Sequence, residues 1–507
     1  MNKEEIVLNM SKIKIKCLFA VLITSMFITV GYSQQNIRKL TLQEALMIAQ
    51  TQSPDALNAK QLFRAGYWQF KTFRGTYLPG VGISATIPDI QRVIQKYTSS
   101  SGLETYVPQQ YTSYSANLAI TQKIGFTGGT IFIRSGLERT DNYYKDSTLT
   151  SYLSTPINIG YSQPIFQFNP FKWDRKLQPL MYDQAKQTYI EDIEEINIAT
   201  TNYFFNLLQA QIEVKISKTN LSNYDTLYRI AKGRYQLGKI AENDLLLLEL
   251  NFLKAQAAVE NADLALDNAL FRLKSFLRIK DTLHIELIPP VEINFIHVNP
   301  DIAVSEAKNN SSMALDFNKR LLEAARDLNR AKMEGRFDAE LTAVFGYNQN
   351  ANTLQNAYKS PLDQEQVSLG LNIPILDWGV ARGKIKMAES QEEIVRNSVE
   401  QERIDFERNV YLKVIQLNMQ KNQLAIAAKS DTVARKTYEV TKGRYLIGKI
   451  NSILDLNNAQ IETDNSEKSY YYALQTFWRS YFELRKMTLY DFMNDHPIYF
   501  NFEDVKP

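Results

Sequence analysis

The sequence predicts a mixed, mostly α-helical fold in which two tandem repeats each contain a β region and a long antiparallel helical hairpin. Residues 233–240 (GRYQLGKI) recur almost unchanged as residues 443–450 (GRYLIGKI). Pro164 and Pro374 are separated by the same 210 residues as these two octapeptides. Glycine and proline are sparse on both sides of each octapeptide, as they are in continuous helices. Each octapeptide is therefore predicted to be the tight turn of a helical hairpin.

A secretory signal peptide is predicted at the N-terminus. Three lysines between positions 12 and 16 precede a largely apolar run over residues 17–30, which is too short to span a membrane as a helix. Acidic residues at positions 4 and 5 are unusual before such a run, so translation starting at Met10 is an alternative. We place the signal peptide at residues 1–34.

Composition limits the environment and the partners of the mature chain. A net charge of +3 over 507 residues is close to balance, so nucleic acid is not implied as a partner. The only cysteine, Cys17, lies in the signal peptide, so the exported chain uses no disulfide. Beyond that peptide no apolar stretch is long enough to span a bilayer as a helix. If the mature chain enters a membrane, it must do so as a closed β-barrel, because lipid offers no partner for backbone polar groups.

The opening element is predicted to be a helix over residues 40–77. Thr41 is suited to cap its N-terminus because Glu44 follows three residues later, and Pro79 ends it. Ala45 and Ala49 reappear 258 residues later as alanines, a larger spacing than that of the turns. The first repeat therefore holds 48 more residues than the second before its hairpin, and we expect an extra β-hairpin there.

The β regions are predicted from alternation of apolar with small or polar residues, clearest over residues 116–121, 157–162 and 366–373. This pattern is typical of strands between lipid and water, and equally of a soluble sheet with one wet face. Residues 125–129 (GFTGG) are predicted to connect two strands of a hairpin. The polar, tyrosine-rich segments 95–114 and 140–153 are predicted to be exposed loops.

Four long helices are predicted, one before and one after each of the two turns. A helix of some 65 residues is about 100 Å long, which no ordinary globular domain can enclose, so we expect an extended coiled structure. Val410, Val414 and Leu417 keep the four-then-three spacing of a coiled-coil seam. The predicted helices cover residues 171–236, 244–277, 379–446 and 453–486.

The less regular segments after the returning helices are predicted to form a belt around the helical part. With them the chain divides into five parts. These are the signal peptide (1–34), a first repeat (35–280, with its β region at 78–165 and its turn at 234–240), an equatorial linker (281–300), a second repeat (301–488, with its β region at 339–376 and its turn at 444–450), and a C-terminal equatorial segment (489–507).

The sequence indicates no catalytic or metal chemistry. His284, His297 and His496 lie in proline-rich segments, away from cysteine or paired carboxylates at the spacing of metal ligands. Neither a nucleophile elbow nor a phosphate-binding loop is present in the sequence. We therefore predict a protein that is not an enzyme and that uses no cofactor and no metal.

Taken in order, these motifs resemble the TolC family of outer-membrane efflux and secretion channels over nearly the whole mature chain. The opening carries residues 40–46 (LTLQEAL), Pro79 precedes the first strand, residues 374–379 (PILDWG) close the second β region, and the two octapeptide turns follow. No single motif is specific to the family. Their order, combined with the duplication, is specific.

The resemblance implies a homotrimer in the outer membrane of a Gram-negative bacterium. Its long helices would form a periplasmic α-barrel, and its strands would contribute to one shared transmembrane β-barrel. Family members usually supply four strands per chain, so the extra hairpin departs from the pattern. Independently of the resemblance, four strands cannot close a barrel, so a pore wide enough for cargo needs several chains. The implied partners are a periplasmic adaptor protein, an inner-membrane RND or ABC exporter, and outer-membrane lipid.

The resemblance also implies that the two turns dock onto the helical hairpin of the adaptor. The alternative is that their glycines are helix caps and nothing more. The residues concerned are Arg234, Tyr235, Gly238 and Lys239 in the first turn, and Arg444, Tyr445, Gly448 and Lys449 in the second.

A gate is implied at the same place. In the family, an acidic residue of the first turn bonds to a tyrosine and an arginine of the second. Asp244 matches the acidic residue and Tyr445 matches the tyrosine. Ile450 stands where the arginine is expected, and the adjacent Lys449 could substitute for it. Asp455 is a candidate for an acidic constriction ring. An ordinary solvated helix end is the alternative for each of the charged residues.

Aromatic residues flank the two junctions between strand and helix. They fit an interface belt at the inner leaflet, and packing at a crowded junction is the alternative. They are Trp173, Trp378, Phe166 and Phe168.

The function that these expectations favour is a passive exit duct of a tripartite efflux or type I secretion system, opened when the adaptor and the pump engage the turns. Two rivals remain. One is a porin that works alone, in which long helices have no use. The other is a periplasm-spanning structural coiled coil that conducts nothing.

Overall fold

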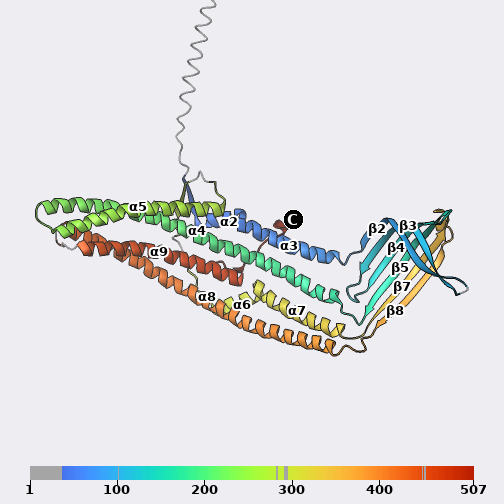
Figure 1. Ribbon diagram of the computed structural model, residues 1–507. Coiled ribbons are helices and arrows are strands. Elements are labelled where there is room, and N and C mark those ends of the chain that lie inside the picture. The colour runs from blue at the N-terminus through green and yellow to red at the C-terminus, as the bar shows by residue number, and fades with distance from the viewer. Residues whose placement is uncertain are drawn as a thin grey trace, which may run out of the picture. The chain divides into compact units, whose positions relative to one another are not determined.

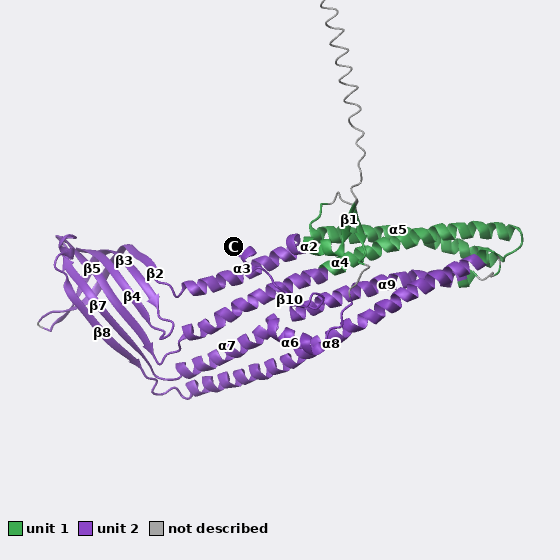
Figure 2. Ribbon diagram, turned by 180° about the vertical axis from the view of Figure 1, so that it is seen from behind, with its two compact units in different colours: residues 1–49, 200–293, 445–455 green, residues 50–199, 294–444, 456–507 purple. Residues whose placement is uncertain are grey.

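The computed structural model describes residues 37–100, 102–280, 284–290, 295–447, 449 and 453–506 (Figure 1). The predicted signal peptide, Gly448 and Ile450 lie outside the described residues. The chain divides into two compact units (Figure 2). The turn unit comprises residues 1–49, 200–293 and 445–455, and the sheet unit comprises residues 50–199, 294–444 and 456–507.

Long helices dominate, and they repeat in length. α4 and α8 each have 67 residues, and the helices that follow them, α5 and α9, each have 36. This confirms the predicted mostly α-helical fold with two long hairpins. No helix in the described part of the chain is both long enough and apolar enough to cross a membrane. The helices are α2 (Leu42–Gln52), α3 (Pro54–Gly75), α4 (Pro170–Gln236), α5 (Glu242–Leu277), α6 (Pro300–Asn310), α7 (Ser312–Glu334), α8 (Val380–Leu446) and α9 (Ile453–Thr488).

The opening helix begins as predicted but is broken once. The Thr41 hydroxyl accepts from the Glu44 amide at 3.3 Å, while the Glu44 carboxylate accepts from the Thr41 amide at 2.9 Å, which is a capping box. The prediction of one helix over residues 40–77 is wrong, because Ser53 starts a new helix by accepting from the Ala56 amide at 3.1 Å. Ser311 caps α7 in the same way in the second repeat.

Six antiparallel strands form one sheet in the sheet unit, in the order β2-β3-β4-β5-β7-β8. The first repeat supplies four of them and the second supplies two, so the expected extra hairpin is present, and residues 125–129 connect β3 to β4. The strands are β2 (Gly80–Thr98), β3 (Glu104–Lys123), β4 (Thr130–Tyr143), β5 (Thr148–Ile165), β7 (Asp338–Ala351) and β8 (Leu362–Asn372).

The predicted loops at 95–114 and 140–153 are wrong. Most of their residues continue the strands, and only short connections remain between β2 and β3 and between β4 and β5. Tyrosine and threonine, which are frequent in both segments, favour extended backbone even where the sequence is polar.

One face of the sheet is apolar and exposed. Ile83 lies opposite Leu118 in the pairing of β2 with β3, and Leu341 lies opposite Leu369 in the pairing of β7 with β8. Ile83 is 77% exposed and Leu369 is 59% exposed. Neighbouring positions on each strand point to the opposite face, which carries small and polar side chains such as Asn117.

The C-terminal segment is held against the helices of the sheet unit. Arg485 at the end of α9 pairs with Glu194 of α4 at 2.8 Å and with Asp491 at 2.9 Å. Burial raises the pKa of the Glu194 carboxyl, although the Arg485 charge opposes the shift. Further along, Phe500 and Phe502 pack on an aromatic cluster of α3 and α4. This network links α4, α9 and the C-terminal segment.

Candidate functional site

Gly238 ends the first long helix with a hydrogen-bonded cap. Its φ is 66°, its amide donates to the Tyr235 carbonyl at 2.8 Å, and the Lys239 amide donates to the Arg234 carbonyl at 2.9 Å. These two bonds are the Schellman pattern, which needs a left-handed residue at this position. Glycine adopts that conformation without strain, whereas a side chain with Cβ does not.

The cap presents a small apolar surface. Leu237 is 71% exposed and Tyr235 is 40% exposed, with the exposed Lys239 beside them. Within the described part of the second turn, Ile447 is 66% exposed and Lys449 is also exposed. Each turn therefore offers an apolar contact next to a positive charge.

The two turns are joined by Arg234. Its Nη2 donates to the Leu446 carbonyl at 3.0 Å and to the Tyr445 carbonyl at 3.5 Å, and its guanidinium carbon lies 5.2 Å from the centroid of the Tyr445 ring. Both carbonyls belong to the last turn of α8, where they have no partner within the helix and carry partial negative charge. The corresponding Arg444 of the second turn is exposed. The two copies of the motif thus differ in their contacts.

Tyr445 is buried beneath this arginine. The residue is 2% exposed, and its hydroxyl makes no hydrogen bond of good geometry with a described residue, although the Arg234 guanidinium lies near it. Burial raises the pKa of Tyr445, and the negative charge of Asp244 adds to the shift while Arg234 opposes it. The structure therefore brings Asp244, Tyr445 and Arg234 close enough to interact electrostatically. Sequence reasoning did not anticipate Arg234 in this cluster, because its partner lies 211 positions away.

Lys449, one of the two other predicted gate residues, is exposed. The second, Asp455, lies apart from this cluster in sequence. It is exposed in the first helical turn of α9, where a carboxylate is favoured by the helix dipole. A role for Asp455 in a constriction remains a prediction.

The four junction aromatics differ in exposure, and all lie within the sheet unit. Trp378 is 88% exposed and Phe166 is 56% exposed, and both have positive φ. Trp173 donates to Asn329 at 3.4 Å, and Arg330 lies 4.8 Å from the Phe168 ring centroid, so these two rings pack against α7. Phe166 also packs on Phe337, with the ring centroids 5.0 Å apart, and the interface role of the four residues stays a prediction.

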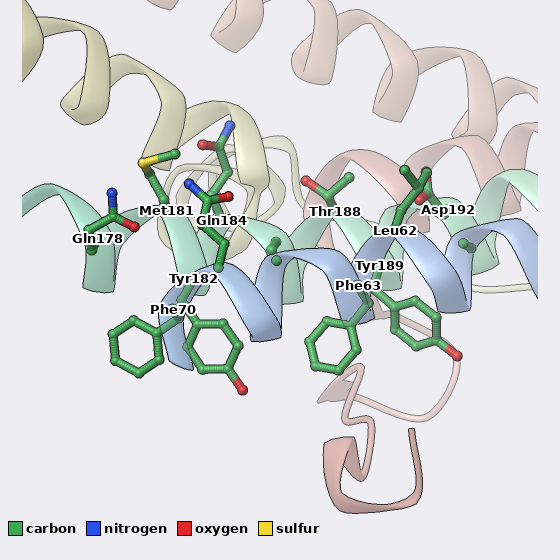
Figure 3. A pocket seen from close by; sticks show the side chains of 14 residues that line it. Leu62, Phe63, Phe70, Gln178, Met181, Tyr182, Gln184, Thr188, Tyr189 and Asp192 are labelled. Carbon is green, nitrogen blue, oxygen red and sulfur yellow. The ribbon is translucent and has the colours of Figure 1, made fainter. Parts of the chain in front are cut away.

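A cavity of about 190 Å³ lies between α3 and α4 (Figure 3). The helices approach closely there, since a Cβ on Gly66 would lie 2.8 Å from that of Ala185. Phe63, Phe70, Tyr182 and Tyr189 project to one side of it (Figure 3), and the C-terminal segment packs on this cluster. Within the described residues no three His, Cys, Asp or Glu side chains are grouped as metal ligands. The cavity is a consequence of helix packing.

The chain thus combines two long helical hairpins that have exposed turns with a six-stranded sheet that has one exposed apolar face. The chain belongs to the outer membrane efflux protein family, which matches residues 130–277 and 311–488. The resemblance to TolC-type channels is thereby confirmed. The protein is an outer-membrane efflux channel of a Gram-negative bacterium with a large periplasmic helical part, and its family is one of channels rather than enzymes.

Solved structures of such channels share the fold. The CmeC outer membrane channel of Campylobacter jejuni is 14% identical, with 92% of this chain and 88% of that chain covered and a TM-score of 0.64. The outer-membrane channel OprN is 14% identical, with 91% and 94% covered and a TM-score of 0.64. VceC of Vibrio cholerae is 12% identical, with 88% and 95% covered and a TM-score of 0.60. No curated protein sequence matches the chain.

Proposed function

We propose that three copies of this chain form the exit duct of a tripartite efflux or type I secretion system. Each chain would contribute two repeats, residues 35–280 and 301–488. A periplasmic adaptor would dock onto the turns 234–240 and 444–450, and an inner-membrane RND or ABC exporter would drive transport. The observation that carries the proposal is the pair of exposed turns, preorganised by the Gly238 cap and joined by Arg234.

The edges of the sheet support assembly. β2 and β8 are each paired on one side only. An unpaired edge exposes a row of backbone donors and acceptors, which is costly in lipid. If β8 of one copy paired with β2 of the next, a ring of three copies would satisfy every edge.

An unpartnered apolar line along α8 also supports assembly. Five of its exposed apolar residues recur at every seventh position, which places them along one side of the helix. Water would face this line in an isolated chain, whereas a neighbouring copy would cover it. The residues are Leu412, Met419, Ile426, Val433 and Val440, which are 44–66% exposed.

A charge placed on this line tests the assembly. We expect Val433→Glu to convert the trimer into monomers, because the carboxylate would be buried between copies. Thr432→Glu, one position away and on another side of the helix, is the matched control and should leave the trimer intact. Mass determination of the detergent-solubilised protein reads the outcome. A monomeric wild-type protein, or a trimeric Val433→Glu variant, would refute the arrangement.

Conductance distinguishes the duct from the structural rival. The wild-type protein reconstituted in a planar bilayer should pass current, whereas a structural coiled coil would pass none. Altering the turns distinguishes the duct from a porin that works alone. Such a porin would keep its transport activity when the turns are altered.

A further inference from the structure

A groove of about 370 Å³ lies where the β2–β3 hairpin extends beyond β4. β3 pairs with β2 from Glu104 onward but pairs with β4 only from Tyr111 onward. Residues 104–110 of β3 therefore have a neighbouring strand on one side only. Asn142 and Tyr143, at the end of β4, and Tyr144 close the corner. The volume falls in the usual range of about 300–1,000 Å³ for ligand pockets.

The groove takes its lining from both faces of the β2–β3 hairpin. Gln95 lies opposite Val107, and Asn142 lies opposite Tyr111, so strand alternation places Gln95, Val107 and Asn142 on one face. The same alternation along β3 puts Gln109 and Asn117 on that face. Lys96, Pro108, Gln110 and Tyr143 alternate to the other face, so the groove lies at the open edge of β3 and draws on both faces.

The lining combines exposed tyrosine rings with unused amide groups. Tyr97, Tyr143 and Tyr144 are 60%, 41% and 62% exposed. Among the hydrogen bonds of the described residues, none engages the four side-chain amides of the lining, which belong to Gln95, Gln109, Gln110 and Asn142. Each such amide can both donate and accept. A sugar ring matches this lining, since its C–H face packs on an aromatic ring and its hydroxyl groups donate and accept.

We propose that this groove binds a neutral oligosaccharide. The only charged lining residue, Lys96, is already paired with Glu104 at 2.5 Å, so the groove offers no unpaired charge to select an ionic ligand. An added peptide strand is disfavoured because Pro108, on the open edge of β3, has no N–H to contribute. This site goes beyond export, and its ligand binding does not depend on the adaptor or the pump.

The test is titration calorimetry on the full-length purified protein with maltohexaose, cellohexaose and chitohexaose. Polygalacturonate and an uncharged hexapeptide serve as an anionic probe and a strand-forming probe. We expect at least one neutral oligosaccharide to bind. Tyr97→Ala and Tyr144→Ala should each weaken that binding by about tenfold or more, because each removes an aromatic stacking surface.

Tyr106→Ala is the matched control. Tyr106 is 73% exposed on the same hairpin but does not line the groove, so binding should be unchanged. Failure of the wild-type protein to bind any of the three oligosaccharides would overturn the proposal. An equal loss in Tyr106→Ala, or a preference for either of the other probes, would do so as well. Export measured in the same variants should be normal, which separates this site from the proposed duct.

Discussion

The guanidinium of Arg234 donates to the carbonyl of Leu446 at 3.0 Å, so a residue of the first repeat caps the last turn of a helix of the second. The same group lies over the ring of Tyr445. A cation at a helix C-terminus is favoured by the helix dipole, and an arginine over an aromatic ring adds to the attraction. The two turns are therefore one coupled structure, and changes in one should be felt in the other.

Replacing Arg234 with alanine should loosen the second turn. The helix cap and the ring contact together are worth about 1–2 kcal/mol. We expect faster hydrogen exchange at the backbone amides around Tyr445. Arg444→Ala is the control, since Arg444 is exposed and makes no hydrogen bond or ion pair with a described residue. Equal effects of the two substitutions would show that the observed contact does not hold the turn.

Replacing Gly238 with valine should reduce export strongly while trimers still reach the outer membrane. Valine at a φ of 66° is strained by about 1–2 kcal/mol or more, so the cap would rearrange and the docking surface would change. Gly233→Ala is the control, because Gly233 lies within α4 and a Cβ there meets nothing within 4 Å. Growth in the presence of an exported toxic compound measures the effect. Normal export by the valine variant would contradict docking at this turn.

Removing the Tyr445 hydroxyl should stabilise the protein. A buried hydroxyl without a partner costs about 1–3 kcal/mol, so Tyr445→Phe should raise the free energy of unfolding by about 1 kcal/mol. Burial also raises the pKa of Tyr445 in the folded state. The unfolded tyrosine therefore ionises first as the pH rises above about 10, and folded stability falls. Denaturant unfolding can be followed from about pH 8 to about pH 11, a range that spans the usual tyrosine pKa of about 10. The phenylalanine variant should lose less stability at high pH than the wild-type protein. An unchanged pH dependence would count against this.

Replacing Arg485 with methionine should destabilise the sheet unit by about 3–5 kcal/mol, because it leaves the carboxylates of Glu194 and Asp491 buried without their cation. Those side chains are only 2% and 7% exposed. Lys486→Met is the control: the Lys486–Glu195 pair is 40% and 57% exposed and should be worth about 0–1 kcal/mol. Thermal unfolding of both variants compares them. Similar losses would mean that the buried network does not hold the segment.

The long helices could be predicted from the sequence, and their observed ends agree to within two residues. The ends of these helices are set by neighbouring residues, namely a glycine in the turn at one end and a strand containing proline at the other. The break at Ser53 was missed for a related reason. Serine followed by proline is a strong helix start, but the apolar spacing continues across it and favoured one helix.

Contacts between the repeats could not be predicted. Tyr235 and Tyr445 occupy the same place in nearly identical octapeptides, yet one is 40% exposed and the other 2%. Local sequence is equal for the two, so the difference arises from the packing of one hairpin on the other. Polarity alone predicts loops at the outer ends of the strands, whereas the preference of tyrosine and threonine for extended backbone prevails there.

The reach of Arg234 across the duplication means that the two halves have ceased to be interchangeable. Arg234 holds the last turn of α8, whereas its counterpart Arg444 is exposed to solvent. Engineering a symmetric version from two copies of the second half would therefore have to restore, by design, a contact that divergence has concentrated in one residue.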